Sequence, residues 1–184
     1  IQALDTEDVT NLTFAQIGGL STSQLSALSA AQIVGLETAD MGALTGAQIK
    51  SLSTSVISQL SSDQIANLSS AAIQAFTTTQ VRALTSAQIS SFPTNQNPYV
   101  TTTQIAALSS SQIQYINQLS PNQIKAVSTS VIANLASDSV PNLSTAQIQA
   151  LTGAQITALG GNGLSGLSSD QIGALSTAAI NTLS

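Results

Sequence analysis

The chain has 184 residues, with three cationic and eight acidic side chains and a formal net charge of −5. So few cations exclude nucleic acid and anionic membrane surfaces as partners, because both are bound chiefly through Lys and Arg. Histidine and cysteine are absent, which excludes imidazole chemistry, thiolate sites and disulfides. No apolar run approaches the roughly 20 residues of a membrane-spanning helix, so we expect no membrane insertion.

An eight-residue repeat, here called an octad, runs along the chain from Leu4. Position one is mostly Leu, position two mostly Ser or Thr, position five mostly Gln, and position six mostly aliphatic, as in LTGAQIKSLSTSVISQLSSDQIANL from Leu44. The repeat excludes one long helix, because eight residues at roughly 100° each advance about 800° and the apolar stripe would drift by about 80° per octad. It also excludes a strand, in which positions one and six would face opposite sides.

A short helix that restarts in every octad fits the pattern. In the octad that begins at Leu60, Ser61 is the N-cap and Gln64 completes a capping box, while Leu60 and Ile65 form a hydrophobic staple. One octad buries too little apolar surface to be stable alone, so neighbours must stack. The sequence therefore predicts an all-α fold: an α-solenoid (superhelix) of very short capped helices, one per octad, with a narrow Leu/Ile core and a polar skin of Ser, Thr, Gln and Asn.

Variations on the octad follow the same reasoning. Near the N-terminus Asp5 replaces Ser or Thr as a cap, and Asp63, Asp138 and Asp170 occupy the second helical position, where a carboxylate suits the positive helix end. Pro121 falls at the first helical position, where proline is favoured. These substitutions favour the helical interpretation.

Three segments interrupt the octads. In chain order, we predict a non-helical loop near 92–100 (FPTNQNPYV), a helix lengthened by the three-residue insertion 116–118 and carrying Tyr115, and an irregular glycine-rich loop near 159–166. The eight-residue spacing resumes after each of the three interruptions, so we expect a single continuous repeat array over 1–184 that is open at both ends. Such an array would associate end to end with itself or continue in a longer chain.

Candidate chemistry is sparse. Asp5, Glu7 and Asp8 cluster at the first predicted helix start, where we interpret them as cap and dipole partners; a calcium site or glycosidase pair would need a second acidic cluster facing them. The serines lack a histidine partner, no motif supports a dyad with Lys50 or Lys125, and GGNGLSG lacks the Asp of calcium-binding nonapeptides. We predict no catalytic residues, no cofactor and no metal site.

The run L-[ST]-x-x-Q-[IV]-x-A-L, as in LTGAQIKSL, LTSAQISSF and LSTAQIQALTGAQITAL, resembles repeat segments of very large bacterial exoproteins. These include RTX-type adhesins and haemagglutinin-like proteins, and the resemblance covers nearly the whole chain. It implies an extracellular or bacterial cell-surface location. We expect a non-enzymatic structural module, meaning a stalk, spacer or filament-forming segment. The alternatives are an ice- or glycan-binding adhesive surface on the same solenoid, whose ligand the sequence does not identify, and a hydrolase.

Overall fold

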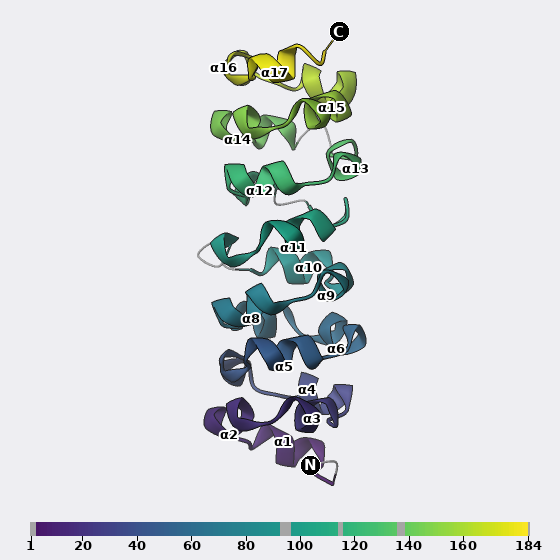
Figure 1. Ribbon diagram of the computed structural model, residues 1–184. Coiled ribbons are helices and arrows are strands. Elements are labelled where there is room, and N and C mark those ends of the chain that lie inside the picture. The colour runs from purple at the N-terminus through teal and green to yellow at the C-terminus, as the bar shows by residue number, and fades with distance from the viewer. Residues whose placement is uncertain (1–2, 93–96, 114–115, 136–138, 184) are drawn as a thin grey trace. The chain divides into compact units, whose positions relative to one another are not determined.

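The computed structural model describes residues 3–92, 97–113, 116–135 and 139–183. Within these ranges the chain forms short helices joined by turns, and no strand is present. The chain divides into two compact units, Ile1–Val100 (unit 1) and Thr101–Ser184 (unit 2). Figure 1 shows that each unit is a succession of short helices. The predicted all-α solenoid of short helices is confirmed.

Unit 1 has close to one helix per octad. Its helices are α1 (Thr6–Thr10), α2 (Phe14–Gly19), α3 (Thr22–Ser26), α4 (Ala30–Val34), η1 (Thr38–Ala43), α5 (Gly46–Ser51), α6 (Thr54–Gln59), α7 (Ser62–Ala66), α8 (Ser70–Ala75), α9 (Thr78–Ala83), α10 (Ser86–Ser90) and η2 (Asn97–Tyr99), where η denotes a 3₁₀-helix.

Every α-helix in the described ranges begins at the predicted N-cap. In α7 the Ser61 hydroxyl accepts a hydrogen bond from the Gln64 backbone N–H (3.1 Å), and Gln64 Oε1 accepts one from the Ser61 backbone N–H (2.9 Å). Asp5 caps α1 in the same way, Pro121 starts α12, and Asp63 lies in the first turn of α7. The capping box of the sequence analysis is therefore confirmed, although Asp138 lies outside the described residues.

The helices end because the residue at position one of the next octad is extended. At the C-caps of α2, α5, α6, α8 and α9 the ψ angle is 129–140°, and the N-cap that follows is extended as well. The N–H of each C-cap residue donates to the carbonyl three residues earlier, as Leu20 does to Ile17. Two extended residues thus form a corner between consecutive helices.

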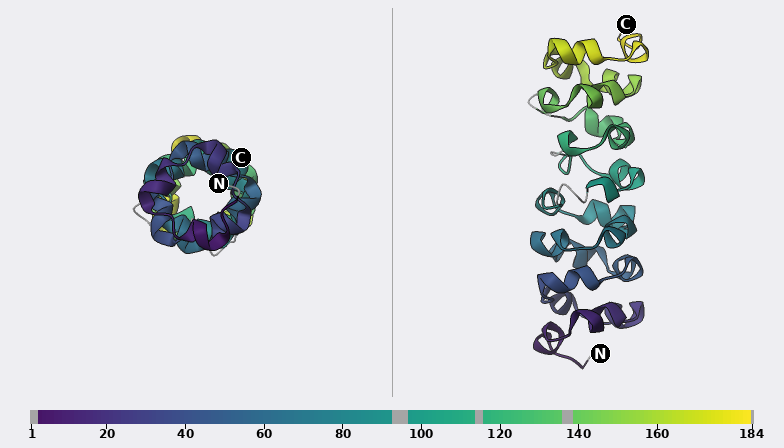
Figure 2. Two further views of the ribbon diagram at one scale, coloured as in Figure 1. Left: turned by 90° about the horizontal axis from the view of Figure 1, so that it is seen from below. Right: turned by 90° about the vertical axis from the view of Figure 1, so that its left-hand side faces the viewer.

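Each helix of unit 1 packs on the third helix further along. Three series result: α1, α4, α6 and α9; α2, η1, α7 and α10; and α3, α5, α8 and η2. The right-hand view of Figure 2 shows these helices of unit 1 rising in successive coils. Side chains at position six are at most 1% exposed from Ile17 to Ile73, and those at position one at most 6% from Leu28 to Leu84. The narrow Leu/Ile core is therefore confirmed.

Unit 2 repeats this packing with more irregularity. Its helices are α11 (Thr102–Ala107), η3 (Ile116–Gln118), α12 (Pro121–Ala126), α13 (Thr129–Ile132), η4 (Val140–Asn142), α14 (Thr145–Ala150), α15 (Gly153–Ser165), α16 (Ser169–Ala174) and α17 (Thr177–Ile180). The helices α11, α12, α14 and α16 form one packed series, and α13, α15 and α17 form another.

The insertion does not lengthen a helix as predicted. Residues 110–112 form a turn, and 116–118 form the separate 3₁₀-helix η3. The Ile116 side chain is 1% exposed, so the extra residues place one more isoleucine in the core. Tyr115, which we expected on the longer helix, lies outside the described residues.

The glycine-rich segment 159–166 also differs from its expected loop. It is helical on both sides of Gly160, whose φ of 63° and ψ of −176° interrupt α15. This backbone conformation is accessible mainly to glycine, so one residue makes the bend and the helix resumes at once. Of the predicted loop near 92–100, the described residues Asn97–Tyr99 form the 3₁₀-helix η2, and residues 93–96 lie outside the described ranges.

Candidate functional site: buried glutamines between coils

The glutamines at position five are the largest group of buried polar side chains. Expecting them in a polar skin was wrong, because most are 8% exposed or less: Gln32, Gln48, Gln64, Gln80, Gln88, Gln104, Gln112, Gln123, Gln147, Gln155 and Gln171. A buried primary amide must find partners for two N–H donors as well as for its oxygen. The contacts of these amides therefore determine what the side chains do.

Gln48 shows the full set of contacts. Its Oε1 accepts from the Thr45 backbone N–H (2.7 Å), which closes the capping box at the start of α5. Its Nε2 donates to two backbone carbonyls of the preceding coil, those of Ile17 (2.9 Å) and Leu20 (2.8 Å), at the C-terminal end of α2. One side chain therefore caps the start of its own helix and the end of a helix 28–31 residues earlier.

The same bridge recurs throughout unit 1. Each acceptor lies 28, 30 or 31 residues before its donor: Gln64 Nε2 donates to Val34 and Leu36 (2.9 and 2.8 Å), Gln80 Nε2 to Ile49 and Leu52 (2.7 and 2.8 Å), and Gln88 Nε2 to Ile57 and Leu60 (2.8 and 2.7 Å). We call this series of bridges the glutamine ladder.

Unit 2 contains the same ladder. Gln155 Nε2 donates to the carbonyls of Ile124 (2.8 Å) and Val127 (2.7 Å). The Gln147 Nε2 reaches Asn117 (2.9 Å) and Leu119 (2.6 Å), so the ladder includes a carbonyl of the insertion itself. The spacing of 28–31 residues is unchanged.

The ladder solves a problem that very short helices create. The last carbonyls of any helix lack intrahelical partners, and in helices of four to six residues such carbonyls are a large fraction of the backbone. Leaving a buried donor or acceptor unpaired costs about 1–3 kcal/mol. A glutamine such as Gln48 pairs two carbonyls and one N–H, and it links consecutive coils directly while the aliphatic core packs beside it.

Two octads of unit 1 replace the glutamine with an apolar residue. Val56 in α6 and Ala72 in α8 are 7% and 0% exposed, and their N-caps keep the hydroxyl bond without a reciprocal side-chain bond. In α6 and α8 position five therefore remains buried, and a small aliphatic group fills it in place of the amide.

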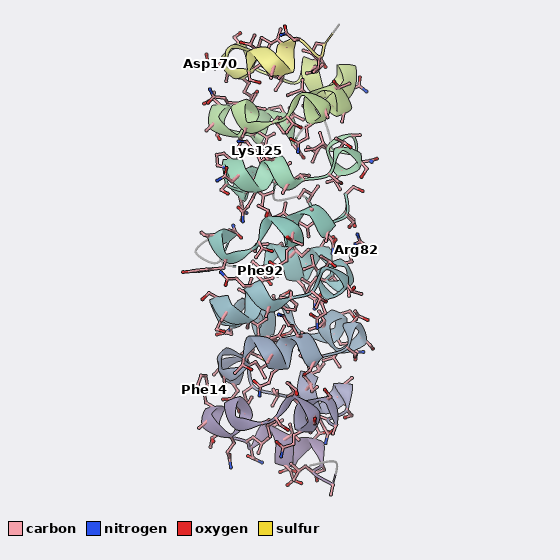
Figure 3. All side chains as sticks on the ribbon, viewed as in Figure 1. Phe14, Arg82, Phe92, Lys125 and Asp170 are labelled. Carbon is pink, nitrogen blue, oxygen red and sulfur yellow. The ribbon has the colours of Figure 1, made fainter. Side chains whose placement is uncertain are left out.

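The acidic candidates meet at the start of α1, and the two lysines lie on other helices. Asp8 completes the α1 capping box with Asp5, and Glu7 is in the same first turn. Lys50 and Lys125 are exposed in the last turns of α5 and α12, where a cation favours the negative helix end. Figure 3 shows the labelled Arg82 in unit 1 and Asp170 in unit 2 on the outside of their coils. Among the described residues no three acidic side chains form a group that could hold a metal ion.

The position-two hydroxyls serve the helix starts. They accept the backbone N–H of the N3 residue in each described α-helix with a Ser or Thr cap, as Thr77 does for Gln80 (3.2 Å). None of the helices in the described ranges combines the length and apolar character needed to cross a bilayer. Of the aromatic residues, Phe76 is in the core, whereas Phe14 and Tyr99 are 54% and 41% exposed.

The sequence pattern of the ALTTAQ repeat matches residues 1–38, 33–70 and 65–94, which together span 94 of the 184 residues. The chain belongs to the ALTTAQ repeat family. The ALTTAQ matches begin 32 residues apart, or four octads, so one such period is just long enough to contain a glutamine and both of its acceptors. No curated protein matches the chain.

A signal for the buried glutamines was present in the sequence. Glu serves the capping box as well as Gln does, yet position five is never Glu in this chain, and the two Glu residues are Glu7 and Glu37. Only the amide carries N–H donors. The preference for Gln over Glu therefore indicates an acceptor beyond the capping box, which the ALTTAQ coils supply.

Proposed function

We propose that this ALTTAQ chain is a non-enzymatic structural repeat module, a stalk, spacer or filament-forming segment of a bacterial cell-surface or secreted protein. The observation that carries the proposal is the glutamine ladder. The buried glutamine amides whose contacts are described bond to the backbone, at a helix start and at helix ends of the preceding coil. Buried polar groups used in this way hold coils at a fixed spacing.

The remaining features support the same function. The charged side chains are few, Asp5 and Asp8 of the acidic cluster form the capping box of α1, and the core is aliphatic. A repeat of one short unit extends by adding coils without changing the core, which suits a part whose task is to span a distance. The resemblance of the octads to repeat segments of bacterial exoproteins supports the proposed location.

A spacer must hold its length, and this can be measured within unit 1. The chain has no native cysteine, so Ser23→Cys and Ala87→Cys, both at exposed positions, give a spin-label pair without background. Pulsed electron paramagnetic resonance should return one narrow distance distribution. A broad distribution would show that the coils slide or open, and it would contradict a spacing role.

The location needs a separate test. Antibodies against the chain should label intact cells of the organism that carries it, or the protein should be recovered from the culture medium. Labelling that requires permeabilised cells, with no protein in the medium, would overturn the surface or secreted part of the proposal and leave the spacer role standing.

A further inference from the structure

Helix α8 of unit 1 carries an alanine where the ladder places a glutamine. This residue, Ala72, is at position five and is 0% exposed. A glutamine here would accept the Ser69 N–H and donate to the carbonyls of Leu44 and Met41, which lie 28 and 31 residues earlier. Gln80 has the same separations from its own two acceptors. The octad spacing therefore identifies three backbone groups that an amide at this position would pair.

These three groups have hydrogen bonds left to make. Among the described residues, no bond to the Leu44 carbonyl and none from the Ser69 N–H is present. The Met41 carbonyl accepts the Leu44 N–H (3.2 Å), but the equivalent ladder carbonyls also receive an amide N–H. Leu44 and Met41 are 1% and 0% exposed, so bulk solvent hardly reaches their carbonyls. Because a buried carbonyl without a donor is costly, these groups require a partner inside the coil.

The backbone around Ala72 brings the three groups together. Around Gln80 the matching N–H and two carbonyls all bond to one carboxamide, so they point into the same small region. The backbone near Ala72 has the same form: Leu44 is extended with a ψ of 125°, as Leu52 is with 140°. Ser69 is an extended N-cap with a φ of −67° and a ψ of 156°, and α8 packs directly on α5, the helix that follows Leu44. The three groups therefore converge here as well.

The donors and acceptors at this point determine which molecule fits. One N–H needs an acceptor, and two carbonyls need donors. A water molecule offers both, and buried waters typically make about three hydrogen bonds. A metal cation does not fit, because the positive end of the Ser69 N–H would face it. Alanine leaves room where a glutamine side chain continues beyond its Cβ, so the three groups match one water molecule.

We propose that the backbone around Ala72 is a binding site for one ordered water. The water accepts a hydrogen bond from the Ser69 N–H and donates to the Leu44 and Met41 carbonyls. It takes the place of the carboxamide, so the ladder continues through α8 without a glutamine. This inference rests on the geometry of the ladder and not on the proposed spacer function.

Val56 in α6 provides a comparison within the same unit. Its side chain fills more of position five with carbon than alanine does. Its N-cap, Ser53, is exposed, whereas Ser69 is half-buried. The Ser53 N–H therefore meets bulk solvent, whose molecules exchange rapidly, and we expect no long-lived water at that helix start.

Water contacts measured by NMR test the site in the unmodified chain. In an isotope-labelled sample, the Ser69 N–H should show a nuclear Overhauser effect to water with the sign of a long-lived bound molecule. The Ser61 N–H, which bonds to Gln64 Oε1 (2.9 Å), and the Ser53 N–H should not show it. All three serines carry the same hydroxyl, so magnetisation relayed through a side chain would appear at all of them. No effect at Ser69, or an equal effect at the three serines, would overturn the proposal.

Two substitutions locate the water. Ala72→Gln supplies the amide itself, so the effect at Ser69 should disappear while the circular dichroism spectrum is unchanged. Ala72→Gly removes only the methyl group and should keep the effect. Persistence of the effect in folded Ala72→Gln, or its loss in folded Ala72→Gly, would contradict the site. If Ala72→Gln does not fold, a crystal structure of the unmodified chain decides. Electron density for a water should lie within about 3.2 Å of the three backbone atoms, and its absence would overturn the proposal.

Discussion

The two units differ in how regular their octads are, but both contain the glutamine ladder. Unit 1 keeps the octad phase from Leu4 to Phe92, whereas unit 2 contains the insertion at 116–118 and the helix break at Gly160. Gln80 in unit 1 and Gln155 in unit 2 nevertheless make the same bridge, to carbonyls 28 and 31 residues earlier at 2.7–2.8 Å. The number of residues between a ladder glutamine and the helix end that it caps is therefore the same in both units. It stays the same although the helices of unit 2 are less regular.

Truncating a position-six side chain should have the largest effect, and the effect should depend on how deeply that side chain is buried. Ile65→Ala in unit 1 removes a side chain that is 0% exposed and should lower the free energy of unfolding by about 4 kcal/mol. Ile172→Ala, at the same octad position in the last coil of unit 2, should cost about 1 kcal/mol or less, since that side chain is half exposed. Chemical denaturation followed by circular dichroism measures both. Equal losses would contradict the difference in burial between the two side chains.

Replacing a ladder glutamine by glutamate should have the next largest effect. Gln80→Glu and Gln155→Glu keep the capping oxygens but bring a carboxylate against two carbonyls, so each should lower the free energy of unfolding by roughly 3 kcal/mol at neutral pH. The loss should shrink as the pH falls, because a protonated carboxyl can donate one of the missing bonds. Gln24→Glu, in the exposed first coil, is the matched control and should change stability by less than about 0.5 kcal/mol. Similar values for all three variants would refute the ladder.

Two glycines, one in each unit, show how closely neighbouring helices pack. A Cβ at Gly46 in unit 1 would lie 2.8 Å from the Ala75 Cβ and 3.2 Å from the Ala71 carbonyl oxygen, whereas one at Gly153 in unit 2 would meet the Thr182 methyl group of an exposed residue. Gly46→Ala should therefore cost about 1–2 kcal/mol of unfolding free energy.

Gly153→Ala should cost less, about 1 kcal/mol, because the exposed Thr182 side chain can rotate away but then gives up its hydroxyl bonds to the Gly153 and Ala179 carbonyls (3.2 and 2.6 Å). Gly19→Ala, with no atom within 4 Å of the added group, is the control and should stabilise α2 slightly. Thermal or chemical unfolding of the three variants makes the comparison. If Gly46→Ala were as stable as Gly19→Ala, the tight packing of α5 on α8 would be wrong.

Loss of a single cap should have the smallest effect and should be equal in the two units. Ser53 caps α6 and Ser128 caps α13 through one hydroxyl bond of 3.3 Å to the N–H of Val56 and Val131, without a reciprocal glutamine. Alanine at either position should cost about 1 kcal/mol. A loss at Ser53 with none at Ser128 would mean that the short helices of unit 2 do not depend on their caps.

The local parts of this structure were predictable because they depend on neighbouring residues. Ser61 and Gln64 lie three residues apart and meet wherever that stretch is helical, so the caps and the Leu/Ile core followed from spacing alone. The second contact of Gln64, to Val34 and Leu36, depends on which earlier residues the coil brings underneath. No pattern among neighbouring residues predicts which earlier residues those are, and for this reason the glutamines were expected at the surface.

The irregular segments show the same limit. Ile113 and Ile116 are three residues apart, which suits one turn of a longer helix as well as the separate 3₁₀-helix that forms. The choice follows from the burial of Ile116 in a core that the segment does not itself supply. At Gly160 the composition of the segment indicated a loop, but a single positive φ makes the bend and the flanking residues remain helical.

Hydrogen exchange of the glutamine side-chain amides tests the ladder most directly. In an NMR experiment on the assigned chain, the Nε2 protons of Gln48 and Gln80, held by two carbonyls each, should exchange with solvent far more slowly than those of Gln16 in the exposed first coil. Uniformly fast exchange at all three glutamines would contradict the account.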